Sequence, residues 1–590
     1  MNMNRNYINI ILFLLLLSFP SFEMIGQNSD FNVRVLDNPA SGYIYLDLQG
    51  KGFGLVDNYG NIKFIDSSNS LKNCINWKML RDGTWGCFNF SSLMIYNENI
   101  ELIREVRFPS QYGADIHDCE VLDNGHYLLL CTMQKNIDMS KVVEGGDTSA
   151  DVRSGVLVET DITGEIYFIW DGFDHFNITD ATSDVDLTQK TINFQHLNSI
   201  SIDNDGNYVI SSRLMDEVTK INKNTGEIIW RFGGKECKNN QFTFLNDTIE
   251  GFWGFSHQHS ANVLPNGNIL LFDNGNLKPE QYSRAVEYNL NLQNMTATKV
   301  WEYRYSPDIY RESMANVQRL YNGNTLINWV IEKITEVRPD KSIAFEMILP
   351  EDFATYRAFR YLTRMNAKRL NINSSGNFNF NGNGKEATKV SLNLTSVSGN
   401  GSLTVEKHDY SPPKSRMSFV DSSFSSILPL RWVFNKIGLN NIQGELIIKA
   451  NEIPQLINPD KVSIYKRDNE ASGGFSELIT NYNSLTNELT AQFSGFGEFI
   501  ICSKKLDNIL LAYPENNKTS LSLKGTLRWQ KLKGATNYNI QLSDDNLFSN
   551  KLINIIANDT NETEYSVQNF SKQYFWRVRG MNNKDTSQWS

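Results

Sequence analysis

The sequence predicts an all-β protein whose first domain is a six-bladed β-propeller. Three observations support this prediction: glycine turns recur along the chain, short apolar strands follow them, and a second type of turn separates each strand from the next. Successive glycines of the first turn type are 42, 81, 61 and 56 residues apart. Repeats of about 40–50 residues with four strands each are typical of propeller blades. The longer spacings leave room for insertions between blades.

The first turn of each repeat is an Asn-Gly or Asp-Gly pair, which strongly favours a β-hairpin. These pairs are Asp82-Gly83, Asn124-Gly125, Asp205-Gly206, Asn266-Gly267 and Asn322-Gly323. A second turn follows each of them, as at Thr163-Gly-Glu and Thr225-Gly-Glu. A further unit at residues 43–65 brings the number to six. A large β-sandwich is the alternative fold, and the double rhythm of turns disfavours it.

The N-terminus, residues 1–27, has the features of a signal peptide. Arg5 precedes an apolar run at residues 10–17, and a cleavage point is expected near Gly26-Gln27. This run is too short to serve as a membrane anchor, and no other stretch is long and apolar enough to span a bilayer. We therefore expect an exported protein in the periplasm, on the cell surface or in the medium, with the propeller at residues 28–364.

Two further β-domains are expected after the propeller. Residues 365–505 alternate without the propeller rhythm and predict an accessory β-sandwich. Residues 508–590 resemble a fibronectin type III domain, with the segments Leu527-Arg-Trp529, Gly534-Ala-Thr-Asn-Tyr538 and Tyr574-Phe-Trp-Arg-Val-Arg579. Such a domain would need one more strand after Ser590, so we expect it to be incomplete.

The composition excludes several classes of function. A formal net charge of −10 argues against nucleic acid as a partner, because no basic face offsets phosphate repulsion. The six cysteines are too few for a disulfide scaffold in a chain of 590 residues, although an oxidising compartment permits some pairing. No cysteine spacing is typical of zinc sites, and we expect no cofactor.

Five polar residues share positions in the repeat when the units are aligned on the glycine of the first turn. His117, Asn198 and His259 each lie 8 residues before that glycine, and His196 and His257 lie 10 residues before it. In regular strands, residues two apart point to the same face. We therefore expect the five side chains to converge where the innermost strands of the blades meet.

Such a ring of polar side chains has several interpretations. Its members could bond only to each other and to ordered water, but the convergence of several blades favours a functional site. Histidines also bind metals. The only carboxylate in register is Asp115, 10 residues before Gly125, so a metal site is the second choice and no metal is expected.

Two arginines are candidate binding groups for an anion. Arg213 lies 7 residues after Gly206, on the strand that returns from the same hairpin, and Arg284 lies in Ser283-Arg-Ala-Val. The planar guanidinium donates several hydrogen bonds and suits sulfate or phosphate. The aromatic side chains of Phe252, Trp253 and Phe255 would either stack on an aromatic ligand or pack between blades.

Several motifs resemble those of the bacterial arylsulfotransferases, a family that does not use the nucleotide sulfate donor. The resemblance covers about residues 106–360, and it is carried by Phe194-Gln-His-Leu-Asn-Ser-Ile, Thr225-Gly-Glu-Ile-Ile-Trp-Arg-Phe-Gly-Gly234, Phe255-Ser-His-Gln-His, Leu264-Pro-Asn-Gly-Asn-Ile, Phe272-Asp-Asn-Gly and Ser283-Arg-Ala-Val-Glu-Tyr.

The resemblance implies a six-bladed propeller that transfers a sulfuryl group from a phenolic sulfate ester to a phenol through a sulfated histidine. His259 matches the nucleophile of the family, with His257 beside it as the other candidate. The family residues that hold the sulfate, some of which also serve in catalysis, match His117, His196, Asn198 and Arg213. No lysine or threonine matches in Ser313-Met-Ala-Asn316.

The resulting hypothesis is an exported aryl sulfotransferase with ping-pong kinetics, which takes a phenolic sulfate donor and a phenolic acceptor and needs no cofactor. The first alternative is a non-catalytic exported propeller for binding or adhesion, because propellers have many functions. A second alternative is a metal- or quinone-dependent enzyme.

Overall fold

A computed structural model describes residues 31–47, 52–66, 74–97, 101–362, 367–381, 388–413, 416–420, 424–504, 506, 508–569, 572–582 and 586–590. The expected signal peptide lies outside these residues. The chain divides into two compact units, residues 1–364 and 365–590. Nearly all of the regular structure is β-strand, so the predicted all-β class is confirmed.

The described part of the first unit contains six sheets that are each built on four antiparallel strands, and we call these sheets blades 1 to 6. Blade 1 consists of β5 (Ile75–Met79), β6 (Trp85–Phe88), β7 (Ser92–Tyr96) and β8 (Leu102–Arg107). Blade 2 consists of β9 (Gly113–Val121), β10 (Tyr127–Ile137), β11 (Ala150–Thr160) and β12 (Ile166–Asp171). Blade 3 consists of β14 (Leu197–Ile202), β15 (Tyr208–Ser212), β16 (Glu217–Ile221) and β17 (Ile228–Gly233).

Blades 4 and 5 are likewise built from strands that follow one another in the chain, whereas blade 6 combines strands from the two ends of the unit. Blade 4 consists of β21 (His259–Val263), β22 (Ile269–Asp273), β23 (Arg284–Asn291) and β24 (Thr296–Arg304). Blade 5 consists of β25 (Asn316–Arg319), β26 (Thr325–Asn328), β27 (Lys333–Val337) and β28 (Ile343–Ile348). Blade 6 consists of β29 (Ala358–Tyr361) with β2 (Tyr43–Asp47), β3 (Phe53–Val56) and β4 (Ile62–Asp66).

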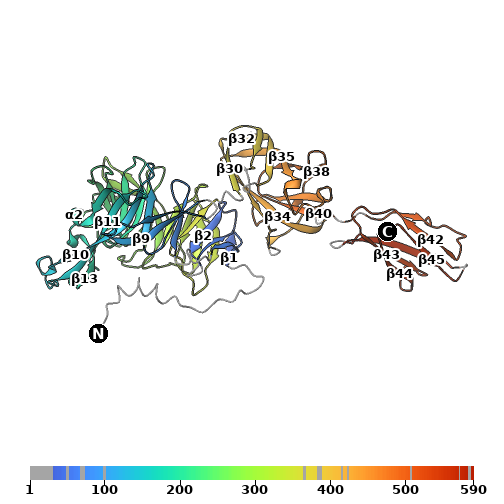
Figure 1. The fold of residues 1–590 in the computed structure, drawn as a ribbon, viewed down its shortest axis with the longest axis horizontal. Coiled ribbons are helices and arrows are strands. Elements are labelled where there is room, and N and C mark those ends of the chain that lie inside the picture. Colours follow the sequence, from blue (N-terminus) through green and yellow to red (C-terminus); the bar gives the residue numbers. More distant parts are fainter. Residues whose placement is uncertain are drawn as a thin grey trace. The chain divides into compact units, whose positions relative to one another are not determined.

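The first strand of each blade is its inner strand, and the inner strands contact one another in a closed series. The series runs from β29 to β5, β9, β14, β21, β25 and back to β29. Strand β1 (Asn32–Leu36) pairs with β28, and β2 pairs with β29, so the N-terminal strands lie beside the last strands of the unit (Figure 1). This pairing joins the two ends of the series and closes it.

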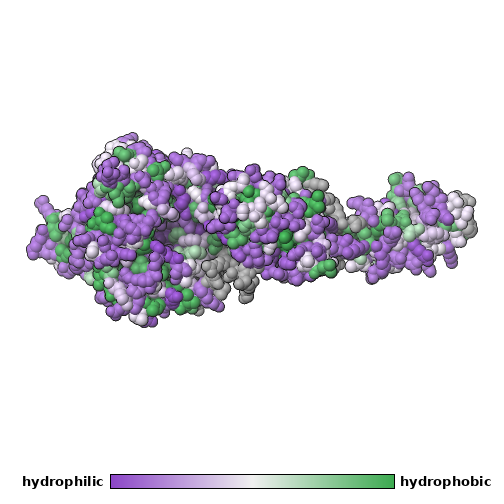
Figure 2. Space-filling model, turned by 90° about the horizontal axis from the view of Figure 1, so that it is seen from above, coloured by the Kyte–Doolittle hydropathy of each residue, from purple (hydrophilic) through white to green (hydrophobic). Residues whose placement is uncertain are grey.

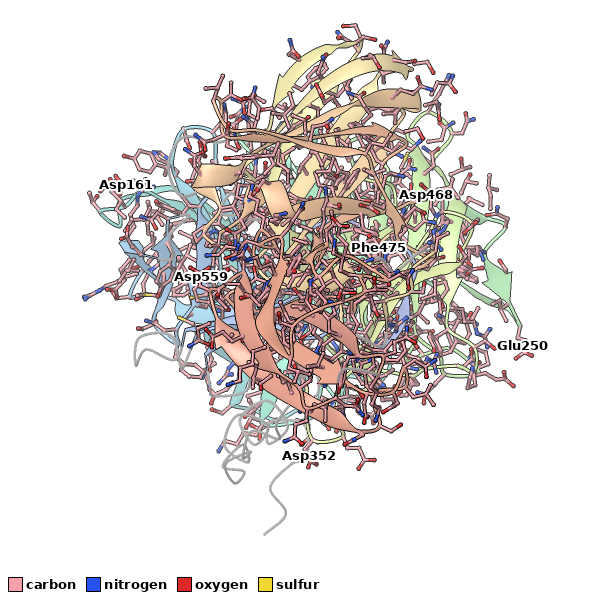
Figure 3. All side chains as sticks on the ribbon, turned by 90° about the vertical axis from the view of Figure 1, so that its right-hand side faces the viewer. Asp161, Glu250, Asp352, Asp468, Phe475 and Asp559 are labelled. Atoms are coloured by element: carbon pink, nitrogen blue, oxygen red, sulfur yellow. The ribbon has the colours of Figure 1, made fainter. Side chains whose placement is uncertain are left out.

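The Asn-Gly and Asp-Gly turns have the predicted place, between the first and second strands of their blades. Gly206 and Gly267 have φ values of +82° and +81°, which glycine adopts without strain. The second turns lie between the third and fourth strands. Asp161 in the turn between β11 and β12 accepts hydrogen bonds from the backbone of Thr163 and Glu165 at the outer edge of blade 2 (Figure 3).

The insertions within and between blades form short elements. They are η1 (Met139–Lys141), α2 (Gly172–His175), η2 (Ile178–Asp180), β13 (Thr191–Asn193), η3 (Arg213–Met215), β18 (Thr243–Leu245), β19 (Thr248–Ile249) and β20 (Phe252–Trp253). Strands β13 and β18 add parallel pairings to β11 and β24. The segment after α2 carries Asp184, which belongs to the site described below.

The hydrophobic core lies between neighbouring blades. One cluster joins Leu93 and Ile95 of blade 1 to Leu129 and Val156 of blade 2, and similar clusters join the later pairs. Complete burial of such a side chain stabilises the fold by about 1.5–3 kcal/mol. All six cysteines are buried. Hydrophobic residues scatter among hydrophilic ones over the surface in Figure 2.

The second unit contains two pairs of sheets. In the first pair, one sheet has the order β30 (Ala367–Ile372), β33 (Gly401–His408), β34 (Phe424–Ile437), β40 (Glu498–Lys504), β36 (Val462–Arg467), β37 (Ser476–Glu477), and the other has the order β31 (Gly376–Asn379), β32 (Val390–Ser398), β35 (Asn440–Lys449), β39 (Glu488–Ser494), β38 (Thr480–Asn483). Short helices η5 (Ala450–Glu452) and η6 (Pro459–Lys461) lie between strands. Buried residues of both sheets share one core, as a β-sandwich requires.

The last pair of sheets has its own core around Trp529 and Tyr538. Its sheets have the orders β41 (Leu511–Tyr513), β42 (Lys524–Trp529), β45 (Glu562–Ser566) and β44 (Lys551–Asn558), β43 (Asn537–Ser543), β46 (Phe575–Met581). The domain boundaries at 505 and 508 and the fibronectin type III likeness stay predictions. No helix of the described residues has the length and apolar character needed to cross a membrane.

Candidate active site

The inner strands of neighbouring blades are joined by side-chain amides near their starts. The Nδ2 atoms of Asn76, Asn198 and Asn316 donate to backbone oxygens of His117, Gln258 and Ala358, each on the next blade, at 2.7–2.8 Å. These bonds satisfy buried polar groups and fix the strands against each other. They explain part of the polar ring: Asn198 has a structural contact in addition to any contact with a ligand.

The inner strands are bulged where the site residues lie. In blades 2, 3 and 4 the pairing register shifts between Leu129 and Cys131, Leu197 and Ser199, and His259 and Asn262. His196 and His257 each have a φ of +54° and precede the strands. The expectation of regular alternation from residue 257 to 259 is therefore wrong, because His257 lies outside β21 and has a left-handed backbone, where side chains do not alternate as they do in a strand.

His259 is buried, and its two ring nitrogens have different partners. Its Nδ1 lies 2.8 Å from Oδ1 of Asn274 and 3.1 Å from the backbone oxygen of His257. Its Nε2 accepts a hydrogen bond of 3.2 Å from the backbone N–H of Met314. Both partners of Nδ1 are acceptors, so Nδ1 carries the proton and Nε2 has the lone pair. Burial and the nearby Arg213 lower the pKa of His259 well below its usual value, which favours the neutral ring.

His257 is also buried, but it lies between two carboxylates. Its Nε2 is 3.1 Å from Asp184 and its Nδ1 is 3.4 Å from Asp216. Asp216 further accepts the backbone N–H of His257 at 2.6 Å. Burial raises the pKa of Asp216 well above its usual range, whereas contact with His257 outweighs burial and lowers the pKa of Asp184 to about 2. Both ring nitrogens of His257 thus lie close to acidic groups, although neither forms a hydrogen bond with the described residues.

His117 and His196 face each other edge to face, with ring centroids 4.8 Å apart. Nδ1 of His117 forms a short contact with Oδ1 of Asp115, the carboxylate that the repeat register placed on the ring. Burial and the neighbouring His117 and Arg213 lower the pKa of His196 well below its usual value. Of the two, His117 contacts a carboxylate, and His196 is held neutral.

Arg213 and Asn198 retain unused polar atoms within this group. Arg213 donates from Nη2 to the backbone oxygen of Glu312 at 3.1 Å, and its buried Nε has no hydrogen-bond partner among the described residues. Oδ1 of Asn198 is likewise unsatisfied. Buried polar atoms without partners are rare and are expected where a ligand binds. His117, His196, His257, His259 and Arg213 influence one another's charge, so the structure brings them together.

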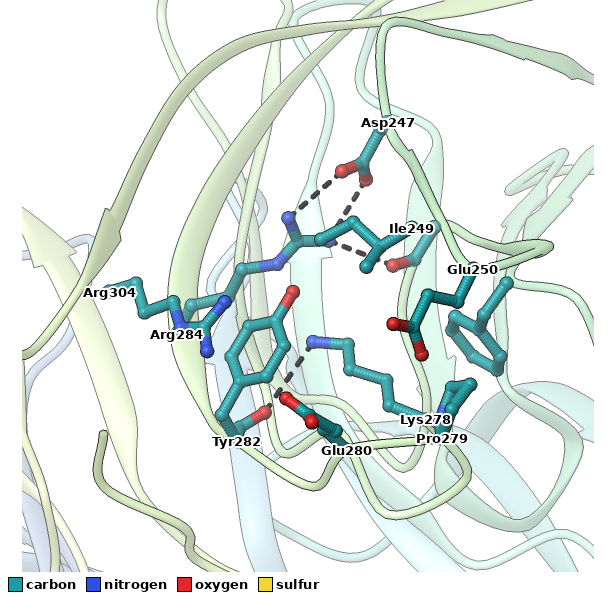
Figure 4. Close-up of a pocket in the computed structure, with 11 residues that line it drawn as sticks. Asp247, Ile249, Glu250, Lys278, Pro279, Glu280, Tyr282, Arg284 and Arg304 are labelled. Atoms are coloured by element: carbon teal, nitrogen blue, oxygen red, sulfur yellow. Dashed lines mark hydrogen bonds and ion pairs between the residues drawn. The ribbon is translucent and has the colours of Figure 1, made fainter. Parts of the chain in front are cut away.

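Arg284 lies elsewhere. It is 1% exposed and bonds to Asp247, Asp273 and Glu302 at 2.7–2.9 Å. A pocket beside it lies in blade 4, between Lys278, Tyr282 and Arg304, and none of the five ring residues lines it (Figure 4). Since carboxylates already occupy its guanidinium, Arg284 has the environment of a structural residue.

The aromatic residues upstream of His257 follow the packing interpretation in two of three cases. Phe255 and Phe252 are buried, and the Phe255 ring packs on Phe232 at 5.2 Å and on Tyr288 at 6.0 Å. Trp253 is 37% exposed and lies under the Lys235 ammonium. The Phe255 ring belongs to the core cluster between blades 3 and 4.

Sequence reasoning missed Arg357 and Tyr356, which precede the inner strand of blade 6. Arg357 is buried, donates to the backbone oxygen of Asn198 at 2.8 Å and lies 3.4 Å from Asp118. The Tyr356 ring lies 6.0 Å from that of His117. Strand β29 pairs with β2 from the other end of the unit, so no Asn-Gly or Asp-Gly turn connects the two strands. The alignment of the repeats on that turn therefore could not place the residues near β29. Asn274 did have a signal: it lies 7 residues after Gly267, as Arg213 does after Gly206.

Comparison with solved structures reveals only distant similarity. A protein of unknown function from Bacteroides caccae is 12% identical over 54% of this chain and 98% of its own, with a TM-score of 0.34. A streptogramin B lyase is 11% identical over 55% and 85%, with a TM-score of 0.31. The Cps50 (Swd1) β-propeller domain of Myceliophteria thermophila is 9% identical over 54% and 90%, with a TM-score of 0.32. These values carry no information about chemistry, and no curated protein matches the chain.

The fold and the site define a class: a β-propeller in which four histidines and an arginine of blades 2 to 4, buried or half-buried, lie together. The described residues contain no group of three or more His, Cys, Asp or Glu side chains that could hold a metal ion. The sequence model of the arylsulfotransferase (ASST) family matches residues 44–357. This match covers more than half of the chain, and the chain belongs to that family.

Proposed function

We propose that the protein is an exported aryl sulfotransferase that moves a sulfuryl group from a phenolic sulfate ester to a phenol through His259. Family membership supports the activity. The observation that carries the choice of residue is the asymmetric environment of the His259 ring, which leaves an unprotonated Nε2. A neutral imidazole is a competent nucleophile near pH 7.

His259 is preferred to His257 as the nucleophile because of their partners. A nucleophilic nitrogen needs a lone pair and a site where an anionic ester can approach. Asp184 and Asp216 face both nitrogens of His257 and would repel a sulfate ester. Arg213 lowers the pKa of both rings and would attract the ester, but the partners of the His259 nitrogens are an amide, a backbone oxygen and a backbone N–H, with no carboxylate among them. We assign to His257 the task of holding the Asp184 and Asp216 carboxylates away from the reacting group.

The sulfuryl group would be held by Arg213, His196 and Asn198. Sulfuryl transfer is similar to phosphoryl transfer, with a loose transition state whose charge lies on the outer oxygens, so prepositioned donors supply most of the catalysis. Arg213 offers its unpaired Nε–H, and Asn198 offers the amide hydrogen that does not bond to Gln258. The neutral His196 can donate one ring N–H. Arg357 adds a buried positive charge close to this group.

Proton transfer is assigned to His117, supported by Asp115. In the first half-reaction the phenolic oxygen leaves with the electron pair of the S–O bond and takes a proton from His117. In the second half-reaction His117 receives the proton of the acceptor phenol, whose oxygen attacks the sulfur. The contact between Asp115 and Nδ1 orients the ring for this proton transfer, as carboxylates do for other catalytic histidines.

A trapping experiment tests the proposal. The purified mature chain is mixed with 4-nitrophenyl sulfate alone, quenched and digested, and fragment mass spectra locate any sulfate. We expect one sulfate on His259 and, when phenol is added, continued release of nitrophenol without nucleotide or metal. Full activity of His259→Ala would contradict the assignment. Failure of a broad screen of aryl sulfates would favour a non-catalytic binding protein.

Export is a separate proposal, supported by the apolar run at residues 10–17 and the expected cleavage near Gly26-Gln27. N-terminal sequencing of the protein recovered from the periplasm, cell surface or medium tests it. A cytoplasmic protein that retains Met1 would contradict export without affecting the assignment of His259.

A further inference from the structure

We propose that Asn274 is a positioning residue that keeps the proton of His259 on Nδ1 throughout both half-reactions, so that sulfur always bonds to Nε2 and the ring always leaves as a neutral imidazole. This proposal rests on the proposed function of His259. It concerns a residue that touches neither the donor nor the acceptor and acts through the imidazole alone.

The orientation of the Asn274 amide is defined at both ends. Its Nδ2 donates to the backbone oxygens of Arg311 at 2.8 Å and Met314 at 3.3 Å. Carbonyl oxygens only accept hydrogen bonds, so the NH₂ group must face them. Oδ1 must then face the His259 ring, where it lies 2.8 Å from Nδ1. An amide oxygen also only accepts, and therefore Nδ1 must be the protonated nitrogen.

The other side of the ring gives the same tautomer independently. The backbone N–H of Met314 points at Nε2 from 3.2 Å, and a backbone N–H can only donate. Met314 and Ala315 have φ values of +64° and +77°, a conformation that residues other than glycine rarely adopt. The backbone thus takes a costly conformation at the point where it presents this N–H to Nε2.

The choice of an amide instead of a carboxylate matters for the chemistry. A carboxylate beside Nδ1 would raise the pKa of His259 and favour the doubly protonated ring, which has no lone pair. The groups that face the ring include the cations Arg213 and Arg357 and the titratable His117 and His196, and burial and these neighbours hold its pKa low. The hydrogen bond to the Asn274 amide also raises the pKa of His259, but burial and Arg213 outweigh it, so the amide orients a ring that stays neutral.

The retained proton has a defined use in each half-reaction. In the first, the Nε2 lone pair forms the N–S bond while the S–O bond breaks, and the ring becomes an N-sulfonated imidazolium that still carries Nδ1–H. In the second, the acceptor oxygen forms a new S–O bond, and the electrons of the S–N bond return to Nε2. The leaving group is then neutral imidazole. Loss of the Nδ1 proton would make it an imidazolate, which is a much poorer leaving group.

The experiment compares Asn274→Ala and Asn274→Asp with the native chain. Histidines are labelled with ¹⁵N, and His259→Gln identifies the His259 signals. We expect the native ring to be protonated at Nδ1 and unprotonated at Nε2, and a mixture of tautomers in Asn274→Ala, where only the oxygen of His257 remains as an acceptor. Protonation of Nε2 in the native chain would overturn the proposal, even if no sulfuryl transfer were observed.

Kinetics supply the second readout. In Asn274→Ala we expect transfer from the sulfated enzyme to phenol to slow by about 10- to 100-fold, and to slow further as pH rises and Nδ1 loses its proton. Asn274→Asp keeps an acceptor but raises the pKa of His259, so sulfation of the enzyme should fall as pH drops below that pKa. Equal losses in both variants without these opposite pH dependences would show a merely structural role and overturn the proposal.

A matched control separates the ring contact from the tether to the 311–314 segment. Asn276 donates to the backbone oxygen of Glu312 at 3.0 Å in the same segment but does not contact His259. We expect Asn276→Ala to leave the tautomer and both pH dependences unchanged. The same tautomer change in Asn276→Ala would assign the effect to the segment and contradict the proposal. If the native enzyme carried its sulfate on another residue, the proposed function of His259 would be refuted. The tautomer measurement would still test the role of Asn274.

Discussion

The backbone N–H of Met314 donates to Nε2 of His259 at 3.2 Å, which joins the segment before blade 5 to the first strand of blade 4. The atom that we propose to attack sulfur is therefore capped by a donor. The sulfuryl group must displace this N–H from the nitrogen, and the N–H is then close enough to serve a sulfuryl oxygen. This backbone donor lies in the segment 313–316, where no lysine or threonine matches the sulfate-binding residues of the family.

Substitution of the two adjacent histidines should separate their tasks. We expect His259→Gln to abolish sulfation and turnover, because no other ring nitrogen has the same environment. We expect His257→Gln to retain the sulfated intermediate and to lose about 10- to 100-fold in turnover, since it only orients neighbouring groups. Single-turnover nitrophenol release measures both. Sulfate on His257 in the His259→Gln chain would reverse the assignment.

Removal of the proton donor should depend on the leaving group. We expect His117→Gln to slow donors with poor leaving groups, such as phenyl sulfate, by about 10²- to 10⁴-fold, and 4-nitrophenyl sulfate much less, since nitrophenolate needs little protonation. Asp115→Asn should act in the same direction with a smaller effect. The control is His126→Gln, because His126 also contacts a carboxylate, Glu159, at 2.7 Å but is not part of the ring. An equal loss with all donors would contradict acid catalysis.

The pH dependence of enzyme sulfation should report the low pKa of His259. Its neutral form is the nucleophile, so the rate should stay constant as pH falls through the usual histidine pKa of about 6.5 and decline only well below it. Burial is the main cause and Arg213 the second. In Arg213→Gln the decline should therefore begin at a higher pH, in addition to weaker binding of the donor. An acid limb that does not move in this variant would contradict the electrostatic contribution.

Substitution of Arg284 should affect stability and not substrate binding. Removal of one partner from a buried ion cluster typically costs about 3–5 kcal/mol, and Arg284→Met would leave Asp247 and Asp273 with one cation fewer. We expect a lower denaturation midpoint of the first unit and a normal KM for the folded protein. The exposed pair at Arg304 and Asp308 is the control, with little effect for Arg304→Gln. A raised KM with unchanged stability would restore Arg284 as a binding residue.

Several features were predictable from the sequence because they are local. Asn-Gly and Asp-Gly pairs define hairpin turns within four residues, so the register that grouped His117, Asn198 and His259 followed from turn chemistry. Their convergence with Arg213 agrees with that register. The parity argument for His257 failed, because His257 precedes β21 and has a left-handed backbone, which alternation in the sequence does not reveal. Arg284 was selected by residue type, and only its carboxylate partners reveal its structural environment.

The sequence alone was sufficient to establish the all-β class, the repeat, the family and the histidines worth testing, since each depends on short motifs or on spacing. It could not establish which nitrogen of His259 is protonated, which carboxylates face His257, or that Arg357 reaches Asn198 across 159 residues. Those facts depend on contacts between strands of different blades and on the joining of β29 to β2. Such contacts form only when the closed series of inner strands brings distant segments together.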